Sequence, residues 1–414
     1  MLESIDLMSK QEISRLRAKR LRGEIEDYLR VEPGLETGMR TVIRAQENKR
    51  KIRDYFNASE EDWDSWIWQL KHRIKDPDVL SHFIPLNKVA LQALYKLSEQ
   101  VRWAVSPYYL SLIDFENYHK SPIYKQAIPS IMELDDTIGS DDPMGEELTN
   151  PAPRITRRYP DRLIINVTNQ CGMYCRHCQR RRNFGEKDLH ARREDVRAAL
   201  QYIRDNSEIR DVLITGGDAL MLSDHGLNWL LGELDAIEHV EIKRIGTRAP
   251  VTLPQRITPE LCAVLKKHPP LYINTQFNSA AEVTPEAKAA CDRLIEAGAV
   301  LGNQAVLLKD INDNLHDMKK LNQELLKIRV RPYYIFHAKQ VKGTSHFIPS
   351  VKTGIGIMAG LRGQTSGLAV PTYIINAPDG YGKTPINPEY IIDINDYEIV
   401  FRTWQGEIFH YPIQ

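Results

Sequence analysis

The chain has 414 residues, of which 42% are hydrophobic and 27% are charged. A globular protein of this length buries a large core and contains two or three structural units. Acidic and basic side chains both number 55, so no net basic field attracts the chain to nucleic acid or to an anionic membrane.

The sequence carries no signal for a membrane or for secretion. No apolar run approaches the roughly 20 residues that span a bilayer, and residues 1–20 lack the apolar region of a secretory leader. Three of the five cysteines cluster at 171, 175 and 178, which suits a metal site in a reducing compartment better than a disulfide framework. We therefore expect a cytoplasmic protein with no nucleic-acid or membrane partner.

The first 135 residues are predicted to be a helical region. Apolar residues recur at helical spacing in segments such as DWDSWIWQLKHRI and LNKVALQALYKLSEQVRWAV, and no catalytic cluster is apparent among them. Residues 136–160 are rich in Gly, Pro and Asp. Their composition predicts a linker that wraps between two units.

Residues 161–342 alternate between short apolar runs and amphipathic segments, which is typical of an α/β protein. Six such units imply a parallel sheet with right-handed crossovers, either an open doubly wound sheet or a curled barrel. Both arrangements place ligands at the carboxyl ends of the strands. The expected strands are 162–168, 211–217, 240–247, 271–278, 300–308 and 331–338.

The stretch NQCGMYCRHCQRRRNFG follows the first expected strand and contains Cys171, Cys175 and Cys178. Three thiolates leave a tetrahedral zinc ion or a four-iron cluster one ligand short, and an open position is typical of a catalytic centre. Structural zinc with His177 as the fourth ligand is the less favoured alternative. The other two cysteines fall at apolar positions of expected helices and are predicted to be buried small hydrophobes.

This cysteine spacing resembles that of the radical S-adenosylmethionine enzymes, and the TGGD sequence that ends the next strand strengthens the resemblance. The resemblance implies that the three cysteines bind a [4Fe-4S] cluster and that S-adenosylmethionine occupies the open iron. Gly216 and Gly217 would then let the backbone approach the methionine moiety, with Asp218 beside them. The alternative for the glycines is an ordinary turn from strand to helix.

A wider set of motifs resembles the lysine 2,3-aminomutase family from about residue 108 to residue 385. These motifs are YPDRLIINVTNQCGMYCRHCQRRR, DVLITGGDAL, RIGTRAPVTLPQRITPEL, LGNQAVLL, KIRVRPYYI and PDGYGKTP. The resemblance implies an incomplete (β/α)6 barrel, with residues 343–414 as a wrapping C-terminal segment. It also implies that Lys383 binds pyridoxal phosphate covalently, that Arg162 lies near the pyridoxal ring, and that Gln304 lies near S-adenosylmethionine.

The family resemblance further implies the reaction. A 5'-deoxyadenosyl radical removes a hydrogen atom from C3 of an amino acid, the amino group migrates between C2 and C3, and the hydrogen returns. Arg180 matches the family arginine that binds the substrate α-carboxylate, a role suited to a planar guanidinium. The implied partners are a low-potential electron donor such as flavodoxin or ferredoxin and further copies of the chain in a homo-oligomer.

Two positions depart from the lysine enzymes. Lys339 and Asn376 stand where those enzymes have the two aspartates that hold the substrate's terminal ammonium group. An ammonium about 4 Å from Lys339 would be repelled by roughly 4 kcal/mol at an effective dielectric constant of about 20, whereas a carboxylate would be attracted. The predicted substrate is therefore L-glutamate, converted to β-glutamate, with lysine or another amino acid as the alternative.

Overall fold

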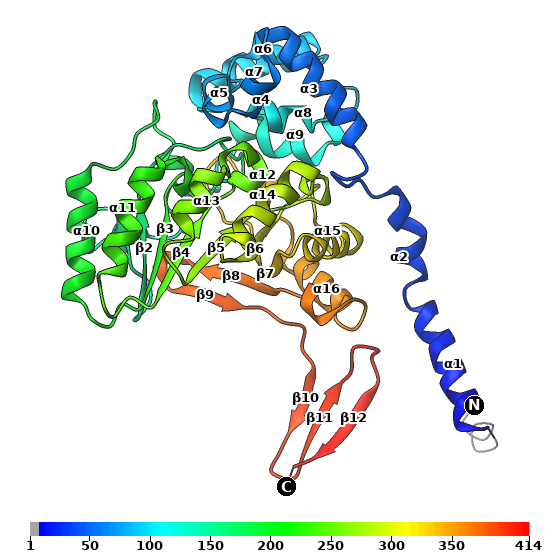
Figure 1. Ribbon diagram of the computed structural model, residues 1–414. Helices are drawn as coiled ribbons and strands as arrows, with labels where there is room; N and C mark the ends of the chain where they lie inside the picture. Colours follow the sequence, from blue (N-terminus) through cyan, green and yellow to red (C-terminus); the bar gives the residue numbers. More distant parts are fainter. Residues whose placement is uncertain (1–7, 414) are drawn as a thin grey trace.

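The structure is a computed structural model that describes residues 8–413; the first seven residues of the predicted helical region and the last residue of the C-terminal segment lie outside the described residues. The N-terminal region is helical. In Figure 1, helices α3 to α9 pack together at one end of the molecule, while α1 and α2 extend from it as an arm. The helices of this region are α1 (Lys10–Gly23), α2 (Glu26–Val31), α3 (Val42–Phe56), α4 (Glu60–Asp64), α5 (Trp66–Lys71), α6 (Pro77–Phe83), α7 (Lys88–Gln100), α8 (Pro107–Ser111) and α9 (Pro122–Ala127).

The centre of the protein is a nine-stranded sheet whose strands follow one another in chain order. Strands β2 to β8 are parallel, and the short edge strands β1 and β9 are antiparallel to their neighbours. The bounds are β1 (Ile155–Thr156), β2 (Arg162–Asn166), β3 (Asp211–Thr215), β4 (Ile242–Gly246), β5 (Leu271–Thr275), β6 (Ala299–Leu307), β7 (Arg331–His337), β8 (Thr372–Ala377) and β9 (Gly382–Pro385).

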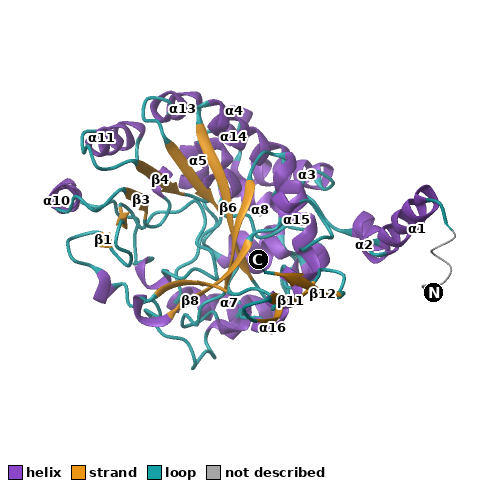
Figure 2. Cartoon of the chain, turned by 90° about the horizontal axis from the view of Figure 1, so that it is seen from below, coloured by secondary structure: helices purple, strands orange, loops and turns teal. Residues whose placement is uncertain are grey.

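Helices connect successive strands and cover the outer face of the sheet, which curls around an open interior (Figure 2). Within residues 8–413, β1 and β9 are not paired with each other, so the barrel is incomplete, and the predicted fold class is confirmed. The connecting helices are α10 (Arg193–Asp205), α11 (Asp224–Asp235), α12 (Ala249–Thr252), α13 (Pro259–Leu265), α14 (Pro285–Glu296), α15 (Leu315–Lys327) and α16 (Val351–Leu361).

The pattern of burial along the strands explains why helices cover one face of the sheet while the other face lines an open interior. Most central strands alternate fully buried residues with half-buried ones, as in β2, β3 and β4. The fully buried set includes Leu163, Ile165, Val212 and Ile214 and belongs to one continuous hydrophobic core with the helices. The half-buried set lies on the opposite face because side chains alternate along a strand. That face is therefore free to line a ligand site.

The C-terminal segment differs from the prediction in its topology. The sequence predicts six parallel strands, whereas β8 pairs in parallel with β7 and adds a seventh. Strand β9 then turns back antiparallel to β8. The remaining strands, β10 (Ile391–Ile394), β11 (Glu398–Arg402) and β12 (Ile408–Pro412), form a separate sheet that projects from the body (Figure 1). This last part of the segment does not cover the site.

The segment 136–160 wraps onto the loop that follows β7. Asp136 accepts hydrogen bonds from the backbone amides of Thr344 and Ser345, each at 3.0 Å. Ser140 pairs with Val341 in an isolated parallel bridge. These contacts fix the loop after β7 from outside the barrel. In residues 8–413, no helix combines the length and apolarity needed to cross a bilayer.

Candidate active site

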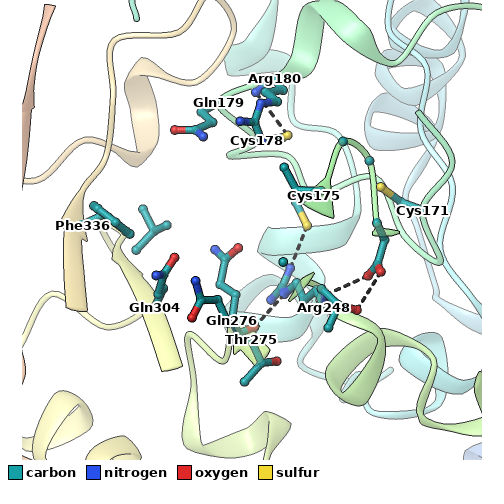
Figure 3. A pocket seen from close by; sticks show the side chains of 18 of the residues that line it. Cys171, Cys175, Cys178, Gln179, Arg180, Arg248, Thr275, Gln276, Gln304 and Phe336 are labelled. Carbon is teal, nitrogen blue, oxygen red and sulfur yellow. Dashed lines mark hydrogen bonds between the residues drawn. The ribbon is translucent and has the colours of Figure 1, made fainter. Parts of the chain in front are cut away.

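One pocket at the carboxyl ends of the strands brings together nearly all the residues predicted for the site (Figure 3). Its walls come from the loops after β2, β3, β4, β5 and β7, from β6 and from the β8–β9 hairpin. Of the predicted residues, the lining includes Cys171, Cys175, Cys178, Arg180, Gly216, Gly217, Asp218, Gln304, Lys339, Asn376 and Lys383. Arg162 is not part of the lining.

The N-terminal helical region holds the cysteine loop in place. The backbone amide of Tyr174 donates to the carbonyl of Ala104 at 3.0 Å, and the Arg73 guanidinium donates to the carbonyl of Cys171 at 2.6 Å. The Arg176 side chain is fully buried and pairs with Glu133 at 2.7 Å. No local sequence pattern indicates this role, because it depends on contacts between segments that are distant along the chain.

The three cysteines suit a cluster better than a single metal ion. Within residues 8–413, no three His, Cys, Asp or Glu side chains are close enough to share one ion. A four-iron cluster instead binds each thiolate to a different iron. The zinc alternative also needs His177, whose Nε2 instead lies 3.2 Å from Nε2 of Gln276 and 3.3 Å from Nδ2 of Asn278. The structure therefore gives no support to a zinc site that uses His177.

Burial disfavours the thiolate form of two of the three cysteines, Cys171 and Cys178. Burial raises the pKa of Cys178 to about 11, and burial together with the nearby Asp218 raises the pKa of Cys171 well above its usual value. Since iron binds the thiolate form, loading a cluster must release protons from these thiols.

The glycines of the TGGD sequence are required by the protein's own backbone. A Cβ on Gly216, whose φ is +138°, would lie 2.3 Å from the carbonyl oxygen of Thr168, and a Cβ on Gly217 would lie 2.5 Å from that of Gln170. The turn after β3 therefore packs directly against the start of the cysteine loop. This contact supports the alternative of a structural turn, and the approach of a ligand to these glycines stays a prediction.

Asp218 links the ends of two neighbouring strands. Its buried carboxylate accepts hydrogen bonds from Oγ1 of Thr247 at 2.6 Å, from the amide of Arg248 at 2.7 Å and from the amide of Leu220 at 3.0 Å. Burial raises its pKa even though these bonds favour the charged form. The contacts define a structural role, while a cofactor contact stays a prediction.

Lys383 lies in a half-buried aromatic environment. Its Nζ is 5.6 Å from the ring centre of Tyr159 and 5.8 Å from those of Tyr334 and Phe336. The Arg162 guanidinium also lies over the Tyr159 ring, 3.9 Å from its centre. Burial, followed by the charge of Arg162, lowers the pKa of Lys383 to about 8. A substantial fraction of this amine is thus neutral near pH 8 and can act as a nucleophile.

The β8–β9 hairpin brings a predicted specificity residue next to the predicted cofactor lysine. Asn376 and Lys383 are direct partners in this antiparallel ladder, so their side chains lie on the same face. The Nδ2 atom of Asn376 is buried and has no hydrogen-bond acceptor among residues 8–413. A buried unpaired donor is costly unless a ligand satisfies it.

Lys339 approaches the same face from the loop after β7. Burial, followed by the charge of Lys383, lowers the pKa of Lys339 to about 7. Of the described residues that line the pocket, only Asp218 is acidic, and its oxygens already accept protein hydrogen bonds. The pocket therefore has an excess of basic side chains, and a bound anion would favour their charged forms.

Arg180 is held by a carboxylate that the sequence analysis did not identify. Its Nε donates to Glu146 at 3.1 Å, and Glu146 also pairs with Arg158 at 3.1 Å and Arg182 at 2.9 Å. Burial disfavours the charged form of Glu146, but the three guanidiniums outweigh burial and lower its pKa. Glu146 comes from the wrapping segment, where it is one of several acidic residues, so no local sequence signal distinguished it.

Gln304 lies on β6 at an irregularity in the sheet. The register between β6 and β7 shifts between Asn303 and Gln304, and such bulges redirect side chains at functional sites. In Figure 3, Gln304 lies between Phe336 and Gln276 at the pocket wall.

The curled parallel sheet with three cysteines at its carboxyl end defines a class of enzyme. A family model described as the radical SAM superfamily matches residues 165–321, and this chain is a member of that superfamily. A second model, described as lysine-2,3-aminomutase, matches residues 358–413.

Curated relatives narrow the class. The chain is 53% identical to glutamate 2,3-aminomutase of Clostridioides difficile, over 96% of this chain and 94% of that protein. It is 46% identical to L-lysine 2,3-aminomutase of Acetoanaerobium sticklandii over 87% of both chains. It is 47% identical to L-lysine 2,3-aminomutase of Fusobacterium nucleatum, over 86% of this chain and 84% of that protein. The chain belongs to the lysine 2,3-aminomutase family and is an isomerase of the aminomutase class.

Solved structures of other radical SAM enzymes are similar over a smaller part of the chain. SuiB of Streptococcus suis bound to S-adenosylmethionine is 14% identical, with a TM-score of 0.40 over 53% of this chain and 51% of that one. A radical SAM methyltransferase of Sphaerobacter thermophilus is 16% identical, with a TM-score of 0.41 over 55% of this chain and 72% of that one.

Proposed function

We propose that this enzyme is a glutamate 2,3-aminomutase that interconverts L-glutamate and β-glutamate with a [4Fe-4S] cluster, S-adenosylmethionine and pyridoxal phosphate. The observation that carries the proposal is that two hydrogen-bond donors, the side chains of Lys339 and Asn376, line the same pocket. The described lining of that pocket contains no free acidic side chain. A second carboxylate on the substrate would satisfy both groups. The curated relative at 53% identity carries the same function in its name.

The alternative is the same chemistry on lysine, which the names of several relatives at 46–47% identity favour. A lysine substrate would place its terminal ammonium near Lys339 without a free carboxylate to hold it. The charge distribution of the pocket therefore favours glutamate over lysine.

Each group has a defined task in this proposal. The cluster and S-adenosylmethionine, when bound, supply a carbon radical, and pyridoxal phosphate supplies the conjugated system that carries the migrating nitrogen. Cys171, Cys175 and Cys178 hold the cluster. Lys383 offers a neutral amine to pyridoxal phosphate. The binding of the cofactors by Arg162, Gly216, Gly217, Asp218 and Gln304 is proposed on the family resemblance.

The substrate would lie between two cationic groups. Arg180 uses its Nε for Glu146, which leaves its two terminal nitrogens for the α-carboxylate. Lys339 and Asn376 would hold the side-chain carboxylate at the other end. The aromatic rings around Lys383 limit the access of water, which strengthens these interactions.

The direct test is an anaerobic assay of iron-reconstituted enzyme with S-adenosylmethionine, pyridoxal phosphate and dithionite. Carbon-13 labelled L-glutamate and L-lysine are offered separately and followed by NMR. We expect β-glutamate from glutamate and no product from lysine. Turnover of lysine alone would contradict the substrate assignment and retain the family chemistry.

Replacing Arg180 by lysine is expected to raise the KM for glutamate about 10- to 100-fold, because a charged hydrogen bond contributes about 1.5–3 kcal/mol. Lysine keeps the charge but loses the planar fork. Arg182→Lys is the matched control, since Arg182 binds the same Glu146 at 2.9 Å and does not line the pocket. Equal effects of the two substitutions would indicate that Arg180 acts only by folding the loop.

The rate at which apoenzyme binds pyridoxal phosphate is expected to rise with pH and to reach half its maximum near pH 8. The neutral amine is the reactive form, and burial with the Arg162 charge lowers the pKa of Lys383 to about 8. The visible absorbance of the lysine adduct, followed after mixing at pH 6 to 10, measures this rate. A midpoint near that of ordinary lysine, about 10.4, would contradict the assignment.

We also propose that the enzyme forms a homo-oligomer in the cytoplasm and receives electrons from a donor of the flavodoxin or ferredoxin type. The support for an oligomer is the C-terminal sheet, in which Ile394, Tyr397, Ile408 and Tyr411 are more than half exposed. Large exposed apolar patches are commonly contact surfaces for another protein chain. Light scattering on the purified enzyme tests this, and a monomer would contradict it.

A further inference from the structure

Arg248 makes a contact that the proposed chemistry does not yet use. This residue follows β4, and its side chain is buried, with 8% of the residue exposed. Its Nη1 lies 2.9 Å from Sγ of Cys175, and Figure 3 shows the guanidinium directed at that sulfur. A guanidinium that donates to a thiolate makes a charge-assisted hydrogen bond.

The guanidinium is fixed on its other sides. Its Nε donates to the carbonyl of Gln276 at 3.0 Å, and its Nη2 donates to Gln126 and to Glu282, both at 2.6 Å. Its position is therefore set by the fold and does not depend on the cysteine.

Glu282 is the counter-charge of Arg248 and is itself fully buried. Its carboxylate also accepts hydrogen bonds from the hydroxyl of Tyr109 at 2.6 Å and from the amides of Asn278 at 2.6 Å and Ser279 at 3.0 Å. These donors satisfy the buried carboxylate oxygens of Glu282 and fix its position beside Arg248. Arg248 and Glu282 thus form a fixed dipole whose positive end faces Cys175.

The three cysteine sulfurs differ in this respect. Among the described residues, Cys178 accepts a hydrogen bond only from the backbone amide of Arg180, at 3.4 Å, whereas Cys175 accepts one from the charged Arg248 side chain. Hydrogen bonds and positive charge near a ligating sulfur stabilise the more electron-rich state of an iron–sulfur cluster.

We propose that Arg248 is a positioning residue that raises the reduction potential of the cluster through Cys175, and that Glu282 limits this effect. The proposal rests on the proposed function in that the cysteines must hold a [4Fe-4S] cluster. The affected step is the transfer of one electron from a low-potential donor to the oxidised cluster, with no bond made or broken. The dipole would make that electron easier to accept.

The test is an EPR-monitored redox titration of reconstituted full-length enzyme without S-adenosylmethionine, so that the signal reports the cluster alone. We expect Arg248→Gln to lower the ratio of reduced to oxidised cluster at least tenfold at a fixed solution potential, which equals a midpoint about 59 mV more negative for one electron. Arg248→Lys retains the charge and should restore part of this loss. Glu282→Gln removes the counter-charge and should raise the ratio.

The matched control is Arg256→Gln, because Arg256 also follows β4, is fully buried and donates to the carbonyls of Leu220 and Leu222 but, among the described residues, to no sulfur; its ratio of reduced to oxidised cluster should change less than twofold. If the Arg248→Gln and Glu282→Gln variants both keep the EPR signal of a four-iron cluster, and their ratios of reduced to oxidised cluster stay within twofold of the wild-type ratio, the inference is wrong and the proposed function stands. If Arg248→Gln assembles no cluster, Glu282→Gln decides: a raised ratio supports the inference, and an unchanged ratio overturns it. A wild-type enzyme that holds no four-iron cluster would overturn the proposed function itself.

Discussion

Replacing both Lys339 and Asn376 by aspartate is expected to reverse the substrate preference from glutamate to lysine. Both residues line the pocket, and the substitution replaces one positive charge by two negative ones. A single pair of like charges about 4 Å apart costs roughly 4 kcal/mol at an effective dielectric constant of about 20. The kcat/KM for glutamate should therefore fall about a thousandfold, while turnover of lysine should appear.

Competition between labelled glutamate and labelled lysine, followed by NMR, measures this reversal in one sample. Lys342→Asp is the matched control, because Lys342 lies three residues further along the same loop with an exposed side chain and does not line the pocket. Its effect on kcat/KM should be less than about threefold, as expected for an exposed charge. A double variant that loses glutamate without gaining lysine would show that pocket shape, and not charge alone, selects the substrate.

Replacing Lys383 by alanine is expected to abolish both the retention of pyridoxal phosphate and the turnover of glutamate. The hairpin that carries Lys383 is held by backbone pairing of β8 with β9 and by the bond of the Lys383 amide to the Tyr159 hydroxyl at 2.9 Å. Alanine leaves these bonds in place, so the expected loss comes from the missing amine. Visible absorbance after gel filtration and the NMR assay measure the two effects.

A control for this substitution must exclude the second amine of the pocket. Reduction of the wild-type adduct with borohydride, followed by peptide mapping, should locate the label on Lys383 and not on Lys339. Iron content equal to that of the wild type would show that the variant is folded. Retention of the visible adduct by Lys383→Ala would contradict the assignment of this lysine.

The wrapping segment has a larger role than its composition suggests. Through Glu146 it orients Arg180, and through Asp136 it fixes the loop that carries Lys339. Both ends of the proposed substrate therefore depend on residues 136–146. Substrate recognition would be set by this segment as much as by the barrel strands.

Much of the fold was predictable because the signals are local. Alternating strands and helices over residues 161–342 predict a parallel sheet, and both architectures open to such a sheet place ligands at the carboxyl ends of the strands. The run VPTYIIN, which contains most of β8, reads as β-like, but its place as the seventh parallel strand was not predicted, because it follows a long glycine-containing segment and belongs to no repeat. The position of the β10–β12 sheet could not be predicted from the sequence either, because its strands are mostly exposed and lack a core-facing pattern.

The amino-acid sequence by itself determined the cysteine triad, which is a property of residue type and spacing. The importance of Lys383 and the charge change at Lys339 and Asn376 followed from the resemblance of the sequence to the lysine 2,3-aminomutase family. Only the tertiary structure decided the partners of these residues. Glu146 beside Arg180, Glu282 beside Arg248 and Asn376 beside Lys383 are contacts across the fold. Such contacts form when packing brings distant segments together and buried charges must find counter-charges, and no local pattern encodes that pairing.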